Sequence, residues 1–156
     1  MTEAFKAHEL VTITIPQEIR DAHAQMIATR TVALGSQAEY RAVHSSLGLD
    51  KYQARELSHR ESEVAQSHGY DHESEYKYYK RYAMAEDSWG RRKNPHITME
   101  WVEARHRMDV ANRTADIARA EYNEYFATPG HPWGECYDLS QAYKRVVDAI
   151  LSAEVA

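Results

Sequence analysis

The sequence predicts an all-α protein, folded as an irregular bundle of five or six helices around one long central helix. Two interleaved series of residues, each spaced by seven positions, indicate the central helix because such spacing places one apolar seam along a helix. The series are Trp101, Met108, Ala115 and Tyr122, and Ala104, Ala111, Ala118 and Tyr125. The other helices are indicated by glycines that separate segments of helical length beyond Pro16. These glycines are Gly35, Gly48, Gly69, Gly90, Gly130 and Gly134.

Length and composition narrow the class of protein. A chain of 156 residues can bury roughly two thirds of its unfolded surface, so we expect one domain over residues 1–156. An extension with a strand would occupy 1–15, and the helical bundle 16–156. The formal net charge of -5 disfavours nucleic acid as a partner but leaves room for a local basic patch. The single cysteine excludes an internal disulfide and a multi-cysteine zinc site.

No apolar run in the sequence is long enough to cross a bilayer, and the N-terminus lacks the apolar segment of a signal peptide. We therefore expect a cytoplasmic protein with no membrane partner. The first element predicted is a short β-strand at 10–15, where apolar residues alternate with threonine. One strand cannot pair its own backbone groups, so we expect it to pair with another segment or between chains.

Helices follow the strand. Pro16 suits the first turn of a helix that Gly35 ends. The next two helices begin at capping boxes, formed by Ser36 with Glu39 and by Asp50 with Gln53. The segment 71–88 carries tyrosines on two faces, which indicates a helix that contacts two neighbours.

The central helix is predicted at 97–126, and the alanines in its seam permit close approach by another helix. That second helix could belong to the same chain or to a second copy, and the sequence leaves both arrangements open. The last helix begins at Asp138, after a loop that contains prolines and glycines.

A Glu-x-x-His motif occurs twice, and this spacing brings a carboxylate and an imidazole together in di-iron helical bundles. The two copies are Glu56 with His59 and Glu103 with His106. If Trp101 takes heptad position a, Glu103 falls at c and His106 at f, roughly opposite the seam. We therefore interpret both motifs as solvated surface and predict no metal and no cofactor. A ferritin-like metal-dependent enzyme is the third alternative.

The chain shows no familiar catalytic motif. Phosphate-binding glycine loops are absent, and Cys136 with His131 lacks the surroundings of a catalytic nucleophile. We expect a non-enzymatic, homo-oligomeric protein-interaction or assembly module, comparable in composition with accessory proteins of phages or mobile elements. Loop tryptophans are favoured interface anchors, and the seam could pair two copies. The predicted partner-binding residues are Trp89, Arg91, Arg92, Lys93, Trp133, Trp101, Met108 and Ala115.

A nucleic-acid-binding helical protein is the main alternative. A basic cluster lies among aromatic residues that could stack on bases, and it consists of Lys77, Lys80, Arg81, Arg91, Arg92 and Lys93. Its best phosphate contacts would be Arg91, Arg92 and Lys93. Acidic residues are interleaved with these cations, however, and pairs such as Glu73 with Lys77 would leave the region nearly neutral. The sequence therefore places this alternative below a protein interaction.

Overall fold

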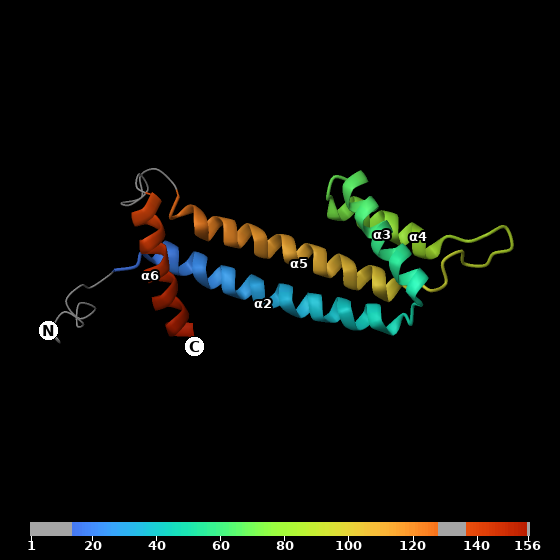
Figure 1. Ribbon diagram of the computed structural model, residues 1–156, viewed down its shortest axis with the longest axis horizontal. Coiled ribbons are helices and arrows are strands. Elements are labelled where there is room, and N and C mark those ends of the chain that lie inside the picture. The colour runs from blue at the N-terminus through green and yellow to red at the C-terminus, as the bar shows by residue number, and fades with distance from the viewer. Residues whose placement is uncertain (1–13, 128–136, 156) are drawn as a thin grey trace. The chain divides into compact units, whose positions relative to one another are not determined.

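The computed structural model describes residues 14–127 and 137–155 (Figure 1). Within these ranges it contains five α-helices and no β-strand, which confirms the predicted all-α class for this part of the chain. The helices are α2 (Gln17–Ser46), α3 (Lys51–Ser67), α4 (His72–Met84), α5 (Met99–Glu124) and α6 (Tyr137–Val155). The predicted strand at 10–15 lies outside the described residues apart from Thr14 and Ile15, which precede α2.

The chain divides into two compact units. Unit 1 holds residues 1–28 and 117–156, and unit 2 holds residues 29–116. Helices α2 and α5 each contribute residues to both units. The single domain expected from chain length stays a prediction.

Helix α2 is continuous through Gly35, so the helix end and the Ser36 capping box predicted there are wrong. A glycine inside a helix costs about 1 kcal/mol relative to alanine, which does not stop a long helix that is packed on both sides of it. Ala33 and Val43 are buried before and after Gly35. The helix ends instead before Gly48, whose φ of 62° lies in the left-handed region that favours glycine.

The starts of α3 and α4 are fixed by aspartate caps. Asp50 accepts a hydrogen bond from the Gln53 N–H at 2.8 Å, and the Gln53 side chain accepts from the Asp50 N–H at 3.1 Å. This confirms the capping box predicted for α3. The Asp71 side chain accepts from the N–H groups of Glu73 and Ser74, and thereby begins α4.

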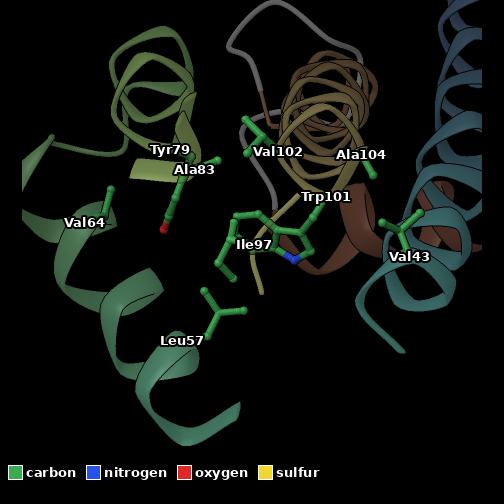
Figure 2. Close-up of a cluster of buried hydrophobic side chains, with 9 residues drawn as sticks. All are labelled: Val43, Leu57, Val64, Tyr79, Ala83, Ile97, Trp101, Val102 and Ala104. Carbon is green, nitrogen blue, oxygen red and sulfur yellow. The ribbon is translucent and has the colours of Figure 1, made fainter. Parts of the chain in front are cut away.

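The core of unit 2 is built around Trp101, whose side chain is fully buried (Figure 2). Its indole meets the ring of Tyr79 edge to face at 5.2 Å between ring centres, an attractive aromatic geometry. Side chains from α2, α3 and α4 surround it in Figure 2. The buried cluster consists of Val43, Leu57, Val64, Tyr79, Ala83, Ile97, Trp101, Val102 and Ala104.

Helix α4 contacts two neighbours, as its two tyrosine faces predict. Tyr76 and Tyr79 face α5, where the Tyr76 hydroxyl donates to Glu103 at 2.6 Å. Tyr78 and Tyr82 face α3, and both contact the guanidinium of Arg60. Helices α3, α4 and α5 therefore share one core in unit 2.

The heptad seam of α5 packs inside the chain in unit 2. Trp101 and Ala104 are fully buried there, and Ala111 is nearly so. Helix α2 lies beside this part of α5: Arg107 pairs with Glu39 at 2.6 Å, and Gln37 donates to Asn112 at 2.7 Å. Of the two arrangements left open by the sequence, packing within one chain is the one observed for these residues.

Unit 1 has a separate core, formed by residues from α2, α5 and α6. Its buried members are Ile15, Ile19, Tyr122, Phe126, Val147 and Leu151. The Tyr122 hydroxyl donates to the carboxylate of Asp148, and Arg20 pairs with Glu154 at 2.6 Å. These contacts tie α6 to the first turns of α2 and the last turns of α5 within unit 1.

Candidate interaction site

A hairpin-shaped loop joins α4 to α5 and extends beyond the helices of unit 2 (Figure 1). Its two arms are held together by backbone hydrogen bonds: the Lys93 N–H donates to the Ala85 oxygen at 2.8 Å, and the Asp87 N–H donates to the Arg91 oxygen at 2.7 Å. An antiparallel bridge pairs Glu86 with Arg92. We call residues 85–93 the 85–93 hairpin.

The tip of the 85–93 hairpin is shaped by Asp87. One oxygen of its carboxylate accepts from the N–H of Trp89 at 2.8 Å and from the N–H of Arg91 at 3.0 Å. The Gly90 N–H donates to the Asp87 carbonyl at 3.1 Å, and Gly90 has a φ of 74°, which a residue with a Cβ rarely adopts. An aspartate that bonds backbone groups two residues ahead is a strong turn former. The tip therefore has one defined shape.

The base of the hairpin is anchored by Arg92. Its guanidinium donates to the Ala83 carbonyl at 2.9 Å and also to the Ile97 carbonyl. Asn94 donates to the Tyr82 carbonyl at 3.1 Å. The carbonyls of Tyr82 and Ala83 belong to the last turn of α4, where helix geometry leaves them without partners inside the helix. Arg92, one of the predicted partner contacts, therefore holds the base of the hairpin to α4 although the residue is exposed.

Trp89 is the most exposed large hydrophobic residue in the described ranges, with 80% of its surface accessible. Arg91 and Lys93 are exposed on the same hairpin. Arg91 lies 3.5 Å from the Asp87 carboxylate, so the negative charge of Asp87 partly offsets the positive charge of Arg91. Because the backbone of the turn is already ordered by hydrogen bonds, a binding partner can cover this exposed indole with little loss of backbone freedom.

The other predicted partner-binding residues lie elsewhere. Trp101 is enclosed in the core of unit 2, and Met108 and Ala115 on α5 are half-buried. Trp133 lies outside the described residues. The 85–93 hairpin is therefore where the predicted residues Trp89, Arg91, Arg92 and Lys93 come together.

The two Glu-x-x-His motifs do not converge. Glu56 and His59 are exposed on α3, where they pair with Arg60 and Glu63 of the same helix. Glu103 and His106 point away from the seam, as predicted, but they meet α4 instead of water: Tyr76 donates to Glu103, and its ring lies 4.4 Å from the His106 ring. Among residues 14–127 and 140–155, no group of three or more histidine, cysteine, aspartate or glutamate side chains could hold a metal ion.

A buried ionic cluster, which the sequence did not reveal, links α3, α4 and α5. Arg105 pairs with Glu61 and lies 3.7 Å from both Glu75 and Asp109. The Tyr40 hydroxyl donates to Glu61 at 3.0 Å. Burial raises the pKa of all three carboxyl groups above the ordinary range, because one guanidinium cannot offset the desolvation of three acids. Only Asp109, four residues after Arg105, could have been paired from spacing alone.

The chain matches no protein-family model, no curated protein and no solved structure. None of the described helices is both long enough and apolar enough to span a membrane.

Proposed function

We propose that this protein is a non-enzymatic protein-interaction module that contacts its partner through the 85–93 hairpin. The observation that supports this proposal is Trp89, an 80% exposed indole on a turn that Asp87 holds in one shape. Tryptophan is enriched among the residues that contribute most to protein interfaces, because its large surface is removed from water in one contact. A hairpin already ordered before binding loses less entropy on association than a flexible loop.

The seam of α5 is not the partner-binding surface in this proposal. Trp101 and Ala104 are already covered within one chain, so they are not free to pair two copies without opening unit 2. Self-association, if the partner is a second copy, would use the hairpin. Light scattering on wild type and Trp89→Ala separates this case: a concentration-dependent increase in mass that the substitution abolishes identifies the second copy as the partner.

Affinity capture from the native host tests the interaction proposal. Wild type, Trp89→Ala and Tyr52→Ala serve as baits, the last being a matched control because Tyr52 is a 76% exposed aromatic on α3. The proposal expects proteins that wild type and Tyr52→Ala retain and Trp89→Ala loses. If all three baits retain the same proteins in the same amounts, the hairpin is not the contact.

Nucleic-acid binding is the second candidate function, and one observation favours it. Arg91 and Lys93 are exposed on the hairpin that carries Trp89, a combination of cations and an aromatic ring suited to a single strand. The test is a double substitution, Arg91→Ala with Lys93→Ala, that leaves the anchor Arg92 in place. Salt-sensitive binding to an oligonucleotide that this change weakens would support the candidate, and absence of binding at low salt would remove it.

A further inference from the structure

The outer face of α4 carries a row of cations that runs toward the hairpin. Lys77, Lys80, Arg81 and Met84 are spaced three, four and seven residues from the first, so they share one side of the helix. All four are exposed, and Met84 has 56% of its surface accessible. The buried residues Glu75, Tyr79 and Ala83 mark the opposite side of α4. We call Lys77, Lys80, Arg81 and Met84 the α4 stripe.

The acidic residues near the α4 stripe are occupied by other contacts. Glu75 is 4% exposed and lies against Arg105, and Asp71 caps the start of α4. Glu73 lies 3.7 Å from His106, so the predicted pair with Lys77 is not the contact observed. Asp87 is bonded to its own turn. None of these four carboxylates forms an ion pair with a lysine or arginine of the α4 stripe, although Glu73 and Glu86 are exposed in the same region.

Four cations of this region have no ion-pair partner among the residues that the structure describes; they are Lys77, Lys80, Arg81 and Lys93. Six cationic and two acidic residues lie between positions 77 and 93. This segment is thus net positive in a chain whose formal charge is -5. A surface of this kind attracts a partner of opposite sign and orients it before contact.

We propose that the α4 stripe and the 85–93 hairpin together bind a short acidic protein segment that also carries apolar side chains. This inference rests on the proposed function, because it names the chemistry of the partner that Trp89 would contact. The stripe supplies cations for carboxylates, and Met84 and Trp89 supply apolar surface for the residues between them. The α4 helix runs directly into the hairpin, so both parts belong to one segment of unit 2.

Charge favours a short acidic segment over a long nucleic acid. A long polyanion would extend past the positive segment onto a chain that is acidic as a whole, where repulsion opposes binding. Met84 has no phosphate to bind, whereas it can pack against an apolar side chain of a peptide.

Fluorescence polarisation with defined probes tests the inference. The probes are a fluorescein-labelled peptide of alternating glutamate and leucine, the same peptide with glutamine in place of glutamate, and a labelled oligothymidylate. We expect wild type to bind the glutamate peptide and not the glutamine peptide, with affinity that falls as salt is added. The triple substitution Lys77→Glu, Lys80→Glu and Arg81→Glu should raise the dissociation constant at least about tenfold, because like charges then face each other.

A matched triple substitution controls for net charge. Arg41→Glu, Lys51→Glu and Arg55→Glu change the same number of exposed cations elsewhere in unit 2, and should change the dissociation constant less than about twofold. Circular dichroism on all variants shows whether each remains helical. Equal weakening by the two triple substitutions would overturn the α4 stripe as the binding surface.

The variants also separate this inference from the proposed function. If Trp89→Ala weakens native partners but wild type binds neither peptide, the hairpin stays the contact and the acidic partner is wrong. If Trp89→Ala weakens nothing, the proposed function fails together with the inference. If the oligothymidylate binds more tightly than the glutamate peptide and the stripe substitutions abolish that binding, the ligand is a nucleic acid and the inference is overturned.

Discussion

The carboxylate of Asp87 accepts a hydrogen bond from the backbone N–H of Trp89 at 2.8 Å, so a side chain two residues earlier fixes the backbone that carries the most exposed indole of the described chain. The same oxygen accepts from the N–H of Arg91 at 3.0 Å. The shape of the hairpin tip is therefore set locally, by hydrogen bonds that span five residues, and does not need packing against a helix.

Asp87→Ala should loosen the tip without unfolding the protein. Two hydrogen bonds, each contributing about 1 kcal/mol, are lost from backbone groups that then exchange freely with water. Hydrogen–deuterium exchange at Trp89 and Arg91 should become about tenfold faster or more, while the free energy of unfolding falls by no more than about 2 kcal/mol. Ser88→Ala, next to it in the turn, is the control and should leave exchange unchanged. Identical exchange in the two variants would mean that Asp87 does not order the tip.

Arg92→Ala should destabilise unit 2, whereas Arg91→Ala should not. Arg92 donates to the carbonyls of Ala83 and Ile97, and its loss leaves both without that donor, at a cost of about 1–3 kcal/mol. Arg91 is exposed and pairs only with the adjacent turn, so its loss should cost less than about 0.5 kcal/mol. Urea denaturation followed by circular dichroism measures both. Equal midpoints for the two variants would contradict the anchoring role of Arg92.

Arg105→Met should be among the most destabilising substitutions in unit 2. It leaves Glu61, Glu75 and Asp109 buried without their cation, which typically costs about 3–5 kcal/mol. Arg107→Met, on the same helix, removes an exposed pair with Glu39 and should cost no more than about 1 kcal/mol. Thermal and urea denaturation of both variants give the comparison. A loss for Arg105→Met no larger than that for Arg107→Met would show that the buried cluster does not hold the three helices together.

The stability of unit 2 should respond to pH through Glu75. Burial raises the pKa of its carboxyl above the ordinary value, even though Arg105 and His72 lie close to it. The native state therefore holds this proton at pH values where the unfolded chain has lost it. The resulting stabilisation is complete below about pH 4, the ordinary pKa of a glutamate, and is lost as the pH rises through the raised native value.

Glu75→Gln isolates this effect, because glutamine keeps the shape of the protonated acid without titrating. The free energy of unfolding of Glu75→Gln minus that of wild type should shift in favour of the variant as the pH rises from about 4 toward neutrality. Denaturation curves over this range supply the difference. A difference that shifts in favour of wild type would mean that the native pKa of Glu75 is lowered.

Two glycines should respond in opposite directions to alanine. Gly35 lies within α2 with open space where a Cβ would project, so Gly35→Ala should stabilise the protein by about 1 kcal/mol. Gly48 has a φ of 62° beyond the end of α2, so Gly48→Ala should destabilise it by about 1 kcal/mol. Melting temperatures of the two variants measure the contrast. Destabilisation by Gly35→Ala would contradict a continuous α2.

Local signals explain which parts of the fold were predictable. The capping box of Asp50 with Gln53 and the seven-residue spacing on α5 depend on neighbours along one helix, and both predictions hold in the structure. The prediction at Gly35 was wrong because a glycine signals a helix end only when tertiary packing does not favour continuing the helix. Gly48 does follow the end of α2 and has a positive φ, whereas Gly35 lies inside the helix. The residue type alone does not distinguish the two conformations.

The candidate site was predictable only in part. Loop composition predicted four partner contacts, Trp89, Arg91, Arg92 and Lys93. It did not predict that Arg92 would also donate a hydrogen bond to the Ala83 carbonyl at the end of α4. The cations of the α4 stripe are visible in the sequence, but interleaved acidic residues make the segment look nearly neutral, since sequence gives no sign of which carboxylates contact other groups. Arg105 pairs with Glu61 and lies close to Glu75, which are 44 and 30 residues away along the chain. Such contacts depend on how the helices pack and cannot be predicted from spacing.

Photo-crosslinking from the hairpin tip shows whether a partner contacts the 85–93 hairpin. A photoreactive phenylalanine analogue would replace Ser88, the exposed neighbour of Trp89, in one sample and Tyr52, the exposed control on α3, in another, each irradiated in extract from the native host. Trp89 stays in place in both samples. We expect a discrete crosslinked protein from position 88 and none from position 52. Crosslinking to the same proteins from both positions, or to none from position 88 while wild type retains a partner in affinity capture, would contradict the hairpin as the contact.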